Sequence, residues 1–298
     1  MTIKQAPKCY PSASEGAKDS HICVISPQTE SESYKLAFAD AEFLLRDELR
    51  AVRLQLEIMK PEIIQQELGV ESTVVIFGGA RIPDAETAAK KVEEEETQAK
   101  REPLNPMAEE RLSCAKRILA KSKFYDEARK LARMITEACL NNDDCDLVVS
   151  TGGGPGIMEA ANRGAFEAGG KSIGLNIVLP HEQSPNPYIT PELCFQFHYF
   201  AIRKMHFLMR AKALVAFPGG YGTMDELFET LTLIQTRKIK PLPVILFCDE
   251  FWSKAVNFDF LVDEGVIAPE DKDLFYCVET AEQAWDIISE FYYNEKQE

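Results

Sequence analysis

The chain has 298 residues, of which 45% are hydrophobic and 27% are charged, and its formal net charge at pH 7 is −15. This composition is typical of a globular protein. The negative charge argues against a protein that binds nucleic acid polymers, because those proteins displace counterions with a basic surface. No apolar run is long enough to span a bilayer, and the N-terminal residues lack the apolar core of a signal peptide. We therefore expect a cytoplasmic protein with no membrane partner.

The cysteines and histidines are dispersed along the sequence. The eight cysteines stand at positions 9, 23, 114, 139, 145, 194, 248 and 277, and none of them forms a Cys-x-x-Cys pair. A structural zinc site or a disulfide framework would need tighter grouping. We therefore expect reduced, mostly buried thiols, no metal site and no cofactor.

The N-terminal part of the chain is expected to lie outside the main fold. Residues 1–20 are small and polar without periodicity, which predicts a disordered tail. Residues 21–70 are expected to form a helical extension, because apolar residues recur at gaps of three, four or seven and predict a helix over 32–60. Pro61 suits the first turn of a second short helix, and Gly69 suits its end. We expect no chemistry in this extension.

Residues 71–298 are expected to form one domain that begins with the buried strand STVVIF at 72–77. The segment 84–123 contains the charged run KKVEEEETQAKRE and predicts a pair of solvated helices inserted into the domain. The insertion is interpreted as a spacer or edge decoration, or alternatively as an oligomer interface or a regulator-binding element. The segment that follows it, YDEARKLARMITEACL, is predicted to be an amphipathic helix.

Beyond that helix the sequence alternates between strands and helices. The predicted strands lie at 146–150, 171–179, 193–200, 213–217, 243–248 and 274–278. They are apolar and lack an alternating polar pattern, which indicates strands that are buried on both faces. The sequence therefore predicts an α/β fold in which a mostly parallel sheet is covered by helices on both sides.

Three glycine-rich turns follow predicted strands, at 78–79, 152–156 and 219–222. In a parallel sheet these turns meet at the carboxyl edge of the strands, where ligands bind. Glycine lets an anion approach backbone N–H groups, and helix N-termini attract negative charge. The turns fit neither a P-loop nor the dinucleotide-binding fingerprint, so we predict another ligand that bears a phosphate.

Thr223 and Glu226 have the spacing of a capping box, in which Thr223 caps a helix and Glu226 reaches back to its backbone. Alternatively, the Glu226 carboxylate lies close enough to a bound phosphate to take part in chemistry. Arg203 and Lys204 would then compensate the negative charge, although both also suit a solvated helix face. His206 is interpreted as a packing residue.

Three segments together resemble the LONELY GUY family of nucleoside 5′-monophosphate phosphoribohydrolases, formerly described as possible lysine decarboxylases. The segments are GGGPGIMEAANRGA at 152–165, RK at 203–204 and PGGYGTMDE at 218–226, and the resemblance covers roughly residues 72–250. The N-terminal helices and the 84–123 insertion exceed the compact core of the family, as expected for a longer bacterial-type member.

The resemblance implies a Rossmann-like, doubly wound catalytic domain over 71–298, and a homodimer or higher homo-oligomer. It implies hydrolysis of the N-glycosidic bond of a nucleotide to a free base and ribose 5-phosphate. The implied catalytic pair is Arg203 and Glu226. The implied substrate-binding residues are Gly152, Gly153, Gly154, Lys204, Gly219, Gly220, Gly222 and Thr223, with Arg81 added where the sequence departs from the compact pattern.

The expected substrate is AMP or a cytokinin riboside 5′-monophosphate. Breaking the C–N bond builds positive charge on the sugar, which a fixed Glu226 carboxylate can stabilise while it orients water. Arg203 either orients Glu226 or holds the phosphate or sugar. The alternatives are a non-catalytic nucleotide sensor or carrier, and a decarboxylase. The decarboxylase is disfavoured because no lysine lies among the glycine loops to hold pyridoxal phosphate.

Overall fold

The computed structural model describes residues 10, 12–20, 24–142, 145–180 and 184–295. The chain divides into two compact units, residues 1–59 and 60–298. The predicted division at residues 20 and 70 stays a prediction, because compactness alone does not test which part carries the function. Within the described ranges, no helix is long and apolar enough to cross a membrane.

The first unit consists of short helical segments. They are α1 (Ala13–Asp19), η1 (Glu32–Tyr34), η2 (Ala37–Ala39), α2 (Ala41–Leu44), η3 (Asp47–Leu49) and the start of α3 (Arg50–Glu67). The α1 helix lies within the tail that was predicted to be disordered. Ser12 and Glu15 form a capping box that stabilises the start of this helix.

The long helix predicted over 32–60 is broken, and α3 begins only at Arg50. Asp40 has an extended backbone and caps α2 through its side chain, which accepts a hydrogen bond from the Phe43 N–H. The backbone of Arg46 is also extended, so the apolar spacing does not form one continuous helix. Pro61 lies inside α3 and does not start a second helix. Proline has no N–H to donate to the carbonyl four residues earlier, yet the helix continues through it. The Gln65 side chain donates an additional hydrogen bond to the Pro61 carbonyl.

The second unit is built on a seven-stranded sheet in the order β4-β3-β2-β1-β5-β6-β7, with every neighbouring pair parallel. The strands are β1 (Ser72–Phe77), β2 (Leu147–Thr151), β3 (Ser172–Ile177), β4 (Cys194–Phe197), β5 (Ala211–Ala216), β6 (Val244–Phe247) and β7 (Tyr276–Val278). The chain winds outward from β1 to β4 and then crosses back to β5 on the other side of β1. This reversal is the topological switch point where open α/β sheets bind ligands.

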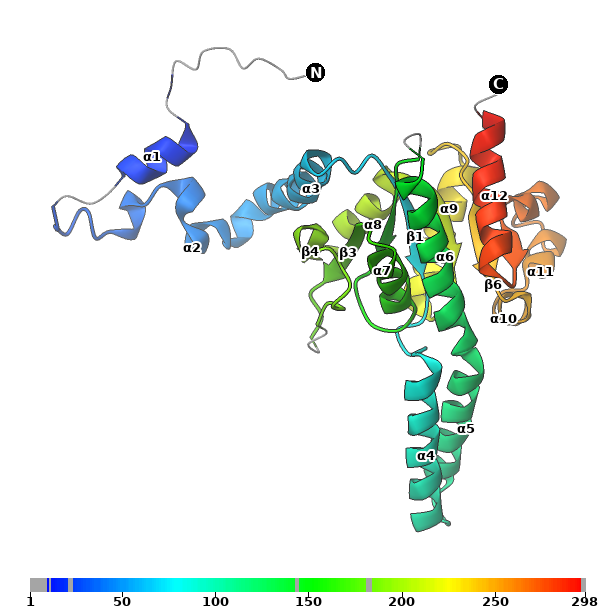
Figure 1. Ribbon diagram of the computed structural model, residues 1–298. Helices are drawn as coiled ribbons and strands as arrows, with labels where there is room; N and C mark the ends of the chain where they lie inside the picture. The colour runs from blue at the N-terminus through cyan, green and yellow to red at the C-terminus, as the bar shows by residue number, and fades with distance from the viewer. Residues whose placement is uncertain (1–9, 11, 21–23, 143–144, 181–183, 296–298) are drawn as a thin grey trace. The chain divides into compact units, whose positions relative to one another are not determined.

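Helices cover both faces of the sheet, as the apolar strands require (Figure 1). The helices α6 (Lys123–Leu140), α7 (Ile157–Glu167) and α12 (Ala281–Glu295) share one core cluster with β1, β2, β5 and β6. The helices α8 (Phe200–Met209) and α9 (Tyr221–Gln235) lie on the other face, where the rings of Phe77 and Phe207 are 4.7 Å apart. The remaining segments are η4 (Pro191–Leu193), α10 (Asp249–Ala255), α11 (Phe258–Asp263) and η5 (Pro269–Leu274). The predicted Rossmann-like, doubly wound α/β class is confirmed.

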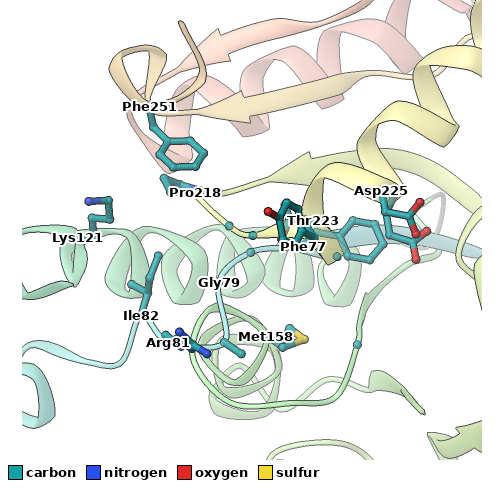
Figure 2. A pocket seen from close by; sticks show the side chains of 18 of the residues that line it. Phe77, Gly79, Arg81, Ile82, Lys121, Met158, Pro218, Thr223, Asp225 and Phe251 are labelled. Atoms are coloured by element: carbon teal, nitrogen blue, oxygen red, sulfur yellow. The ribbon is translucent and has the colours of Figure 1, made fainter. Parts of the chain in front are cut away.

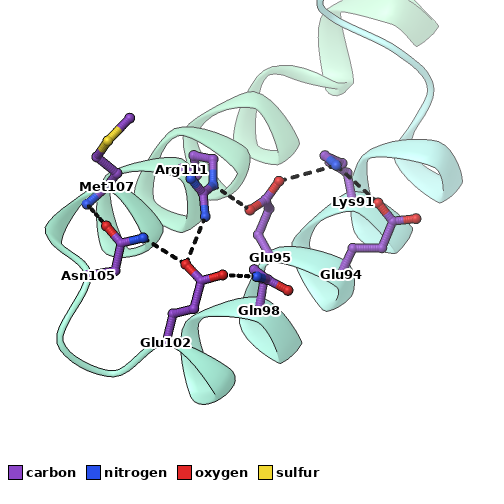
Figure 3. Close-up of polar contacts among 8 residues, drawn as sticks. All are labelled: Lys91, Glu94, Glu95, Gln98, Glu102, Asn105, Met107 and Arg111. Carbon is purple, nitrogen blue, oxygen red and sulfur yellow. Dashed lines mark hydrogen bonds and ion pairs between the residues drawn. The ribbon is translucent and has the colours of Figure 1, made fainter.

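The insertion at 84–123 folds as a hairpin of two helices, α4 (Ala85–Arg101) and α5 (Pro106–Lys121). Asp84 caps the first helix, and Asn105 with Pro106 starts the second. The charges of the hairpin pair with one another: Lys91 contacts Glu94 and Glu95, and Arg111 bridges to Glu95 and Glu102 (Figure 3). In the chain, the hairpin is inserted between β1 and α6.

The expectation of reduced, mostly buried thiols is wrong. A disulfide joins Cys139, in the last turn of α6, to Cys145, just before β2. The turn that ends the helix brings these two residues together, with 4.6 Å between their Cα atoms, although their spacing is not that of a familiar motif. Cys114 and Cys277 are exposed, and Cys194 and Cys248 are half-buried. Cys9 and Cys23 lie outside the described residues.

Candidate active site

The loops that follow β1, β2 and β5 line one cavity of about 670 Å³ at the switch point of the sheet (Figure 2). Eight of the predicted site residues lie in its lining: Arg81, Gly152, Arg203, Gly219, Gly220, Gly222, Thr223 and Glu226. The predicted meeting of the three glycine turns at one edge is therefore found in the structure. A cavity of this size is in the range of small-molecule sites.

Gly153 and Gly154 are not among the residues that line the cavity, and they shape the loop after β2. Gly153 has a φ of +74°, and a Cβ atom there would lie 2.5 Å from the Oδ1 of Asn176. The carbonyl of Gly154 accepts a hydrogen bond from the Nδ2 of Asn186 at 3.1 Å. Both glycines are buried, so their predicted contact with substrate stays a prediction, and the structure gives them a role in loop geometry.

Two buried asparagines that the sequence reasoning missed fix this loop. The Oδ1 of Asn162 accepts from the Oγ1 of Thr151 at 2.7 Å and from the Nδ2 of Asn186 at 2.9 Å. Asn186 also donates to the carbonyl of Gly153 at 3.2 Å. Because these amides and hydroxyls are buried and satisfy one another, they hold the glycine turn in one conformation. No sequence pattern places Asn186, on the proline-rich loop, beside Asn162.

The glycine turn after β5 leads directly into α9, which begins at Tyr221 with Gly220 as its N-cap residue. No side chain caps this helix, so its first N–H groups face the cavity without an intrahelical partner. Gly219 lets the Thr223 side chain approach, because a Cβ atom at Gly219 would lie 2.1 Å from the Thr223 Oγ1. The arrangement provides backbone donors for an anion.

The capping-box interpretation of Thr223 and Glu226 is wrong, because the helix begins before Thr223. Thr223 lies in the first turn of α9 and Glu226 lies further along the helix, so neither can act as a box across the N-cap. The glycines allow the helix to start early without a side-chain cap. Glu226 therefore does not have the helix-capping role that the spacing suggested.

Glu226 is a buried carboxylate, with 5% of its surface exposed, and it faces the cavity. Within the described part of the chain, no group donates a hydrogen bond to it. Burial raises the pKa of Glu226 to about 7, even though the positive charges of Lys204 and Arg203 act in the opposite direction. A carboxyl group that titrates near neutral pH inside a cavity is typical of an acid–base or charge-stabilising residue.

Arg203 is held beside the cavity by two contacts of its own side chain. Its Nε donates to the carbonyl of Leu175 at 2.7 Å, and its guanidinium lies 5.0 Å from the centre of the Phe207 ring. Gly152 makes room for it, since a Cβ atom at Gly152 would lie 2.7 Å from the Arg203 Nη2. Burial lowers the pKa of Arg203, and the charge of Glu226 opposes that shift. The guanidinium is thus fixed between the second glycine turn and Glu226.

Lys204 points away from this cavity. Its Nζ lies 3.0 Å from Asp225 and 3.2 Å from Glu229, and it lines a second cavity of about 580 Å³. Asp225 lines the first cavity, so the ion pair lies between the two. The predicted contact of Lys204 with substrate stays a prediction, and in the structure Lys204 acts on Glu226 through its charge.

Other residues of the cavity were not predicted. They include Ile82, Lys121, Met158, Phe200, Tyr221 and Phe251. Met158 and Tyr221 lie within the family segments at 152–165 and 218–226, and the other four lie outside those segments. His206, predicted to be a packing residue, is buried on α8 with its ring 5.3 Å from that of Phe197. In the described ranges, no group of three or more His, Cys, Asp or Glu side chains is placed to hold a metal ion.

Residues 158–288 match the family model described as "Possible lysine decarboxylase". This match agrees with the resemblance to the LONELY GUY family that the sequence motifs carry. A relative from Oryza sativa subsp. japonica, named as a probable cytokinin riboside 5′-monophosphate phosphoribohydrolase, is 28% identical over 57% of this chain and 78% of the relative. A cytokinin riboside 5′-monophosphate phosphoribohydrolase from Arabidopsis thaliana is 29% identical, over the same shares of the two chains.

Among solved structures, the chain is similar to the Moco carrier protein from Chlamydomonas reinhardtii. The identity is 18%, the match covers 75% of this chain and 99% of that chain, and the TM-score is 0.43.

Proposed function

We propose that the protein is a hydrolase that cleaves the N-glycosidic bond of a nucleoside 5′-monophosphate, giving a free base and ribose 5-phosphate. The names of the relatives support a hydrolase of this bond. The observation that carries the proposal is the position of Glu226, a buried carboxylate in the same cavity as the uncapped N-terminus of α9 and Arg203.

The glycine turn at 219–222 holds the 5′-phosphate in this proposal. The free N–H groups at the start of α9 donate to the phosphate oxygens, and the positive end of the helix dipole favours their charge. Thr223, on the same turn of the helix, adds a hydroxyl donor. Fixing the phosphate here places the ribose within reach of the next turn of the helix, which carries Glu226.

Glu226 acts at the sugar. As the C–N bond lengthens, positive charge develops on the ribose ring, and an ionised carboxylate beside C1′ stabilises that charge and accepts a hydrogen bond from the attacking water. The surroundings that raise the pKa of Glu226 to about 7 also limit its solvation, which makes its charge more effective inside the cavity. The rate should therefore rise with pH as Glu226 ionises.

Arg203 serves as the fixed positive charge opposite this carboxylate. Its hydrogen bond to Leu175 and its contact with the Phe207 ring leave it few orientations. From that place it keeps part of the Glu226 population ionised, and its terminal nitrogens are free to contact the sugar or the phosphate.

We propose cytokinin riboside 5′-monophosphates and AMP as the substrates, since both carry the adenine ring and the 5′-phosphate. The relatives named above act, by their names, on cytokinin riboside 5′-monophosphates. The homo-oligomer that the resemblance implies stays a proposal.

The test is to incubate the full chain separately with AMP, GMP, CMP, UMP and isopentenyl-AMP, and to measure free base by chromatography and ribose 5-phosphate enzymatically. The proposal predicts equal amounts of both products from an adenine nucleotide. If no nucleotide releases base although nucleotides raise the melting temperature, the protein is a nucleotide sensor or carrier.

A further inference from the structure

Asn186 lies on the loop between β3 and η4, is only 7% exposed, and directs most of its hydrogen bonds at the glycine turn after β2. Its backbone N–H donates to the carbonyl of Gly153 at 2.9 Å. Its Nδ2 donates to the carbonyls of Gly153 and Gly154, at 3.2 and 3.1 Å, and to the Oδ1 of Asn162 at 2.9 Å. Because a buried amide is costly without partners, these bonds join the loop and the turn into one unit.

The turn depends on contacts from outside to hold its shape. The segment 152–156 contains four glycines, and two of them, Gly153 and Gly156, have φ angles of +74° and +70°. Glycine populates many backbone conformations, so neighbouring groups have to select one of them. The Oγ1 of Thr151 accepts from the Gly153 N–H at 3.0 Å, and Asn186 binds the two carbonyls that follow. Asn186 therefore helps to set the path of the turn.

The cavity side of the same turn lies against Arg203. Gly152 lines the cavity, and a Cβ atom on it would lie 2.7 Å from the Arg203 Nη2. The Leu175 carbonyl holds the Nε at 2.7 Å, while the backbone at Gly152 limits where the terminal nitrogens can lie. If the turn moved toward the cavity it would displace the guanidinium, and if it moved away it would leave the guanidinium room to rotate.

Glu226 is sensitive to the position of this guanidinium. Burial raises the pKa of Glu226, and the cations Lys204 and Arg203 on α8 lower it. The anions Glu229 and Asp225, both on α9, raise it further. A displaced Arg203 would oppose the effect of burial less strongly, so the pKa of Glu226 would rise.

A purely structural role for Asn186, as an anchor of its own loop, is the alternative. Thr190 provides the comparison, because it anchors the same loop at another place. Its Oγ1 accepts from the Ser172 N–H at 3.0 Å, and its N–H donates to the Ser172 carbonyl at 3.2 Å. Ser172 begins β3, so Thr190 holds the loop at the opposite edge of the sheet from the glycine turn.

We propose that Asn186 is a positioning residue for the reaction, which fixes the turn at 152–154 so that the Arg203 guanidinium stays beside Glu226. Asn186 is not among the residues that line the cavity, so it acts through the turn and through Arg203. This inference rests on the proposed function for the part that Glu226 and Arg203 play in the reaction.

The experiment measures kcat and KM for AMP in the full chain, in Asn186→Ala, in Arg203→Ala and in the double variant. Asn186→Ala should lower kcat about tenfold, because a catalytic group is misplaced. It should change KM by less than about threefold, since the phosphate is held at 219–222. In the Arg203→Ala background it should cause little further loss, because both changes act on the same guanidinium.

Thr190→Val is the matched control, which weakens the loop without touching the glycine turn. It should lower the melting temperature and leave kcat unchanged. If Asn186→Ala does not fold, Asn186→Ser takes its place in the same comparison. The serine hydroxyl is shorter than the amide and has one hydrogen to donate, so the loss should have the same direction.

A second measurement does not depend on turnover. The Glu226 carboxyl is titrated by ¹³C NMR, and its signal is assigned by its loss in Glu226→Gln. The midpoint should move to higher pH in Asn186→Ala and stay in place in Thr190→Val, because only the first substitution releases Arg203.

Four results would overturn the inference: an unchanged kcat in Asn186→Ala, an equal loss in Thr190→Val, an undiminished further loss in the Arg203→Ala background, or a midpoint that does not move. If the unmodified chain releases base and any of these is found, the function stands and the role of Asn186 is removed. If no nucleotide releases base but the midpoint moves as expected, the function is removed and the coupling of Asn186 to Arg203 stands.

Discussion

Charged side chains are exposed and paired on the α4–α5 hairpin, whereas the cavity contains a buried carboxylate without such a pair. On the hairpin, Lys91 and Glu94 lie 3.1 Å apart with more than half of each side chain exposed. In the cavity, Glu226 is buried, accepts no hydrogen bond within the described ranges, and has its pKa raised to about 7. Exposed pairs contribute little energy, whereas a buried charge without a close partner destabilises the fold. A protein retains such a charge where it serves a function.

The first prediction compares an arginine from each region. Arg203→Ala removes the fixed cation beside Glu226 and should lower kcat/KM by about 10² or more, the usual scale for a positioned charge in an active site. Arg111→Ala, on the hairpin, should change kcat/KM by less than about twofold, since its contacts are with hairpin glutamates. Steady-state kinetics of both variants make the comparison. Similar losses in the two variants would contradict it.

A second prediction concerns the glycines that make room in the cavity. Gly152→Ala places a methyl group 2.7 Å from the Arg203 Nη2, so it should displace the guanidinium and lower kcat about tenfold or more. Gly220→Ala meets no atom within 4 Å, and its φ of −96° suits alanine. It should leave the melting temperature unchanged and raise KM, because its methyl group lies where the phosphate approaches. If Gly152→Ala kept the full kcat, the position of the Arg203 guanidinium would not matter for the reaction.

The third prediction uses the pH dependence of stability. With a folded pKa of about 7 and an unfolded value near 4.5, Glu226 binds a proton more readily in the folded state. Its contribution therefore becomes unfavourable as pH rises from about 4.5 to 7, and the full cost remains above pH 7. Glu226→Gln should raise the free energy of unfolding at pH 8 by up to about 3 kcal/mol, and by little at pH 4.5.

Urea unfolding of both proteins at the two pH values provides the measurement. A helix-capping role would give the reverse sign, a loss of stability in the variant at pH 8.

The smallest expected effect is on the stability of the hairpin. Arg111→Ala removes contacts to Glu95 at 3.3 Å and Glu102 at 3.8 Å, and should lower the free energy of unfolding by less than about 1 kcal/mol. High salt should reduce the difference further, because these side chains are partly exposed. If the free energy of unfolding fell by several kcal/mol, the exposed charges of the hairpin would contribute more to stability than this comparison allows.

Much of the cavity could be predicted because its framework follows from backbone rules. Apolar strands without alternation require a parallel sheet, and parallel strands bring the loops after β1, β2 and β5 to one edge. Arg203 and Glu226 lie at that edge because each is on a helix next to one of these strands. The motif at 218–226 therefore indicated both the family resemblance and the position of the Glu226 carboxylate.

The features that sequence reasoning missed depend on where helices begin and on contacts distant in the chain. The Thr223–Glu226 spacing suggested a cap, but the glycines let α9 start at Tyr221. Lys121 reaches the cavity only because the hairpin returns the chain to its starting edge. Pairing of Cys139 with Cys145 likewise depends on the turn after α6, which residue types alone do not describe.

The central claim is that Glu226 performs chemistry in the cavity, and one comparison tests it most directly. The rate of base release from AMP and isopentenyl-AMP is measured for the unmodified chain, Glu226→Gln and Asp225→Asn. Asp225 is the matched control, because it lines the same cavity one residue away but is exposed and paired with Lys204. The account predicts a loss of about 10² to 10⁴ for Glu226→Gln and a much smaller change for Asp225→Asn. Full base release by Glu226→Gln would contradict it.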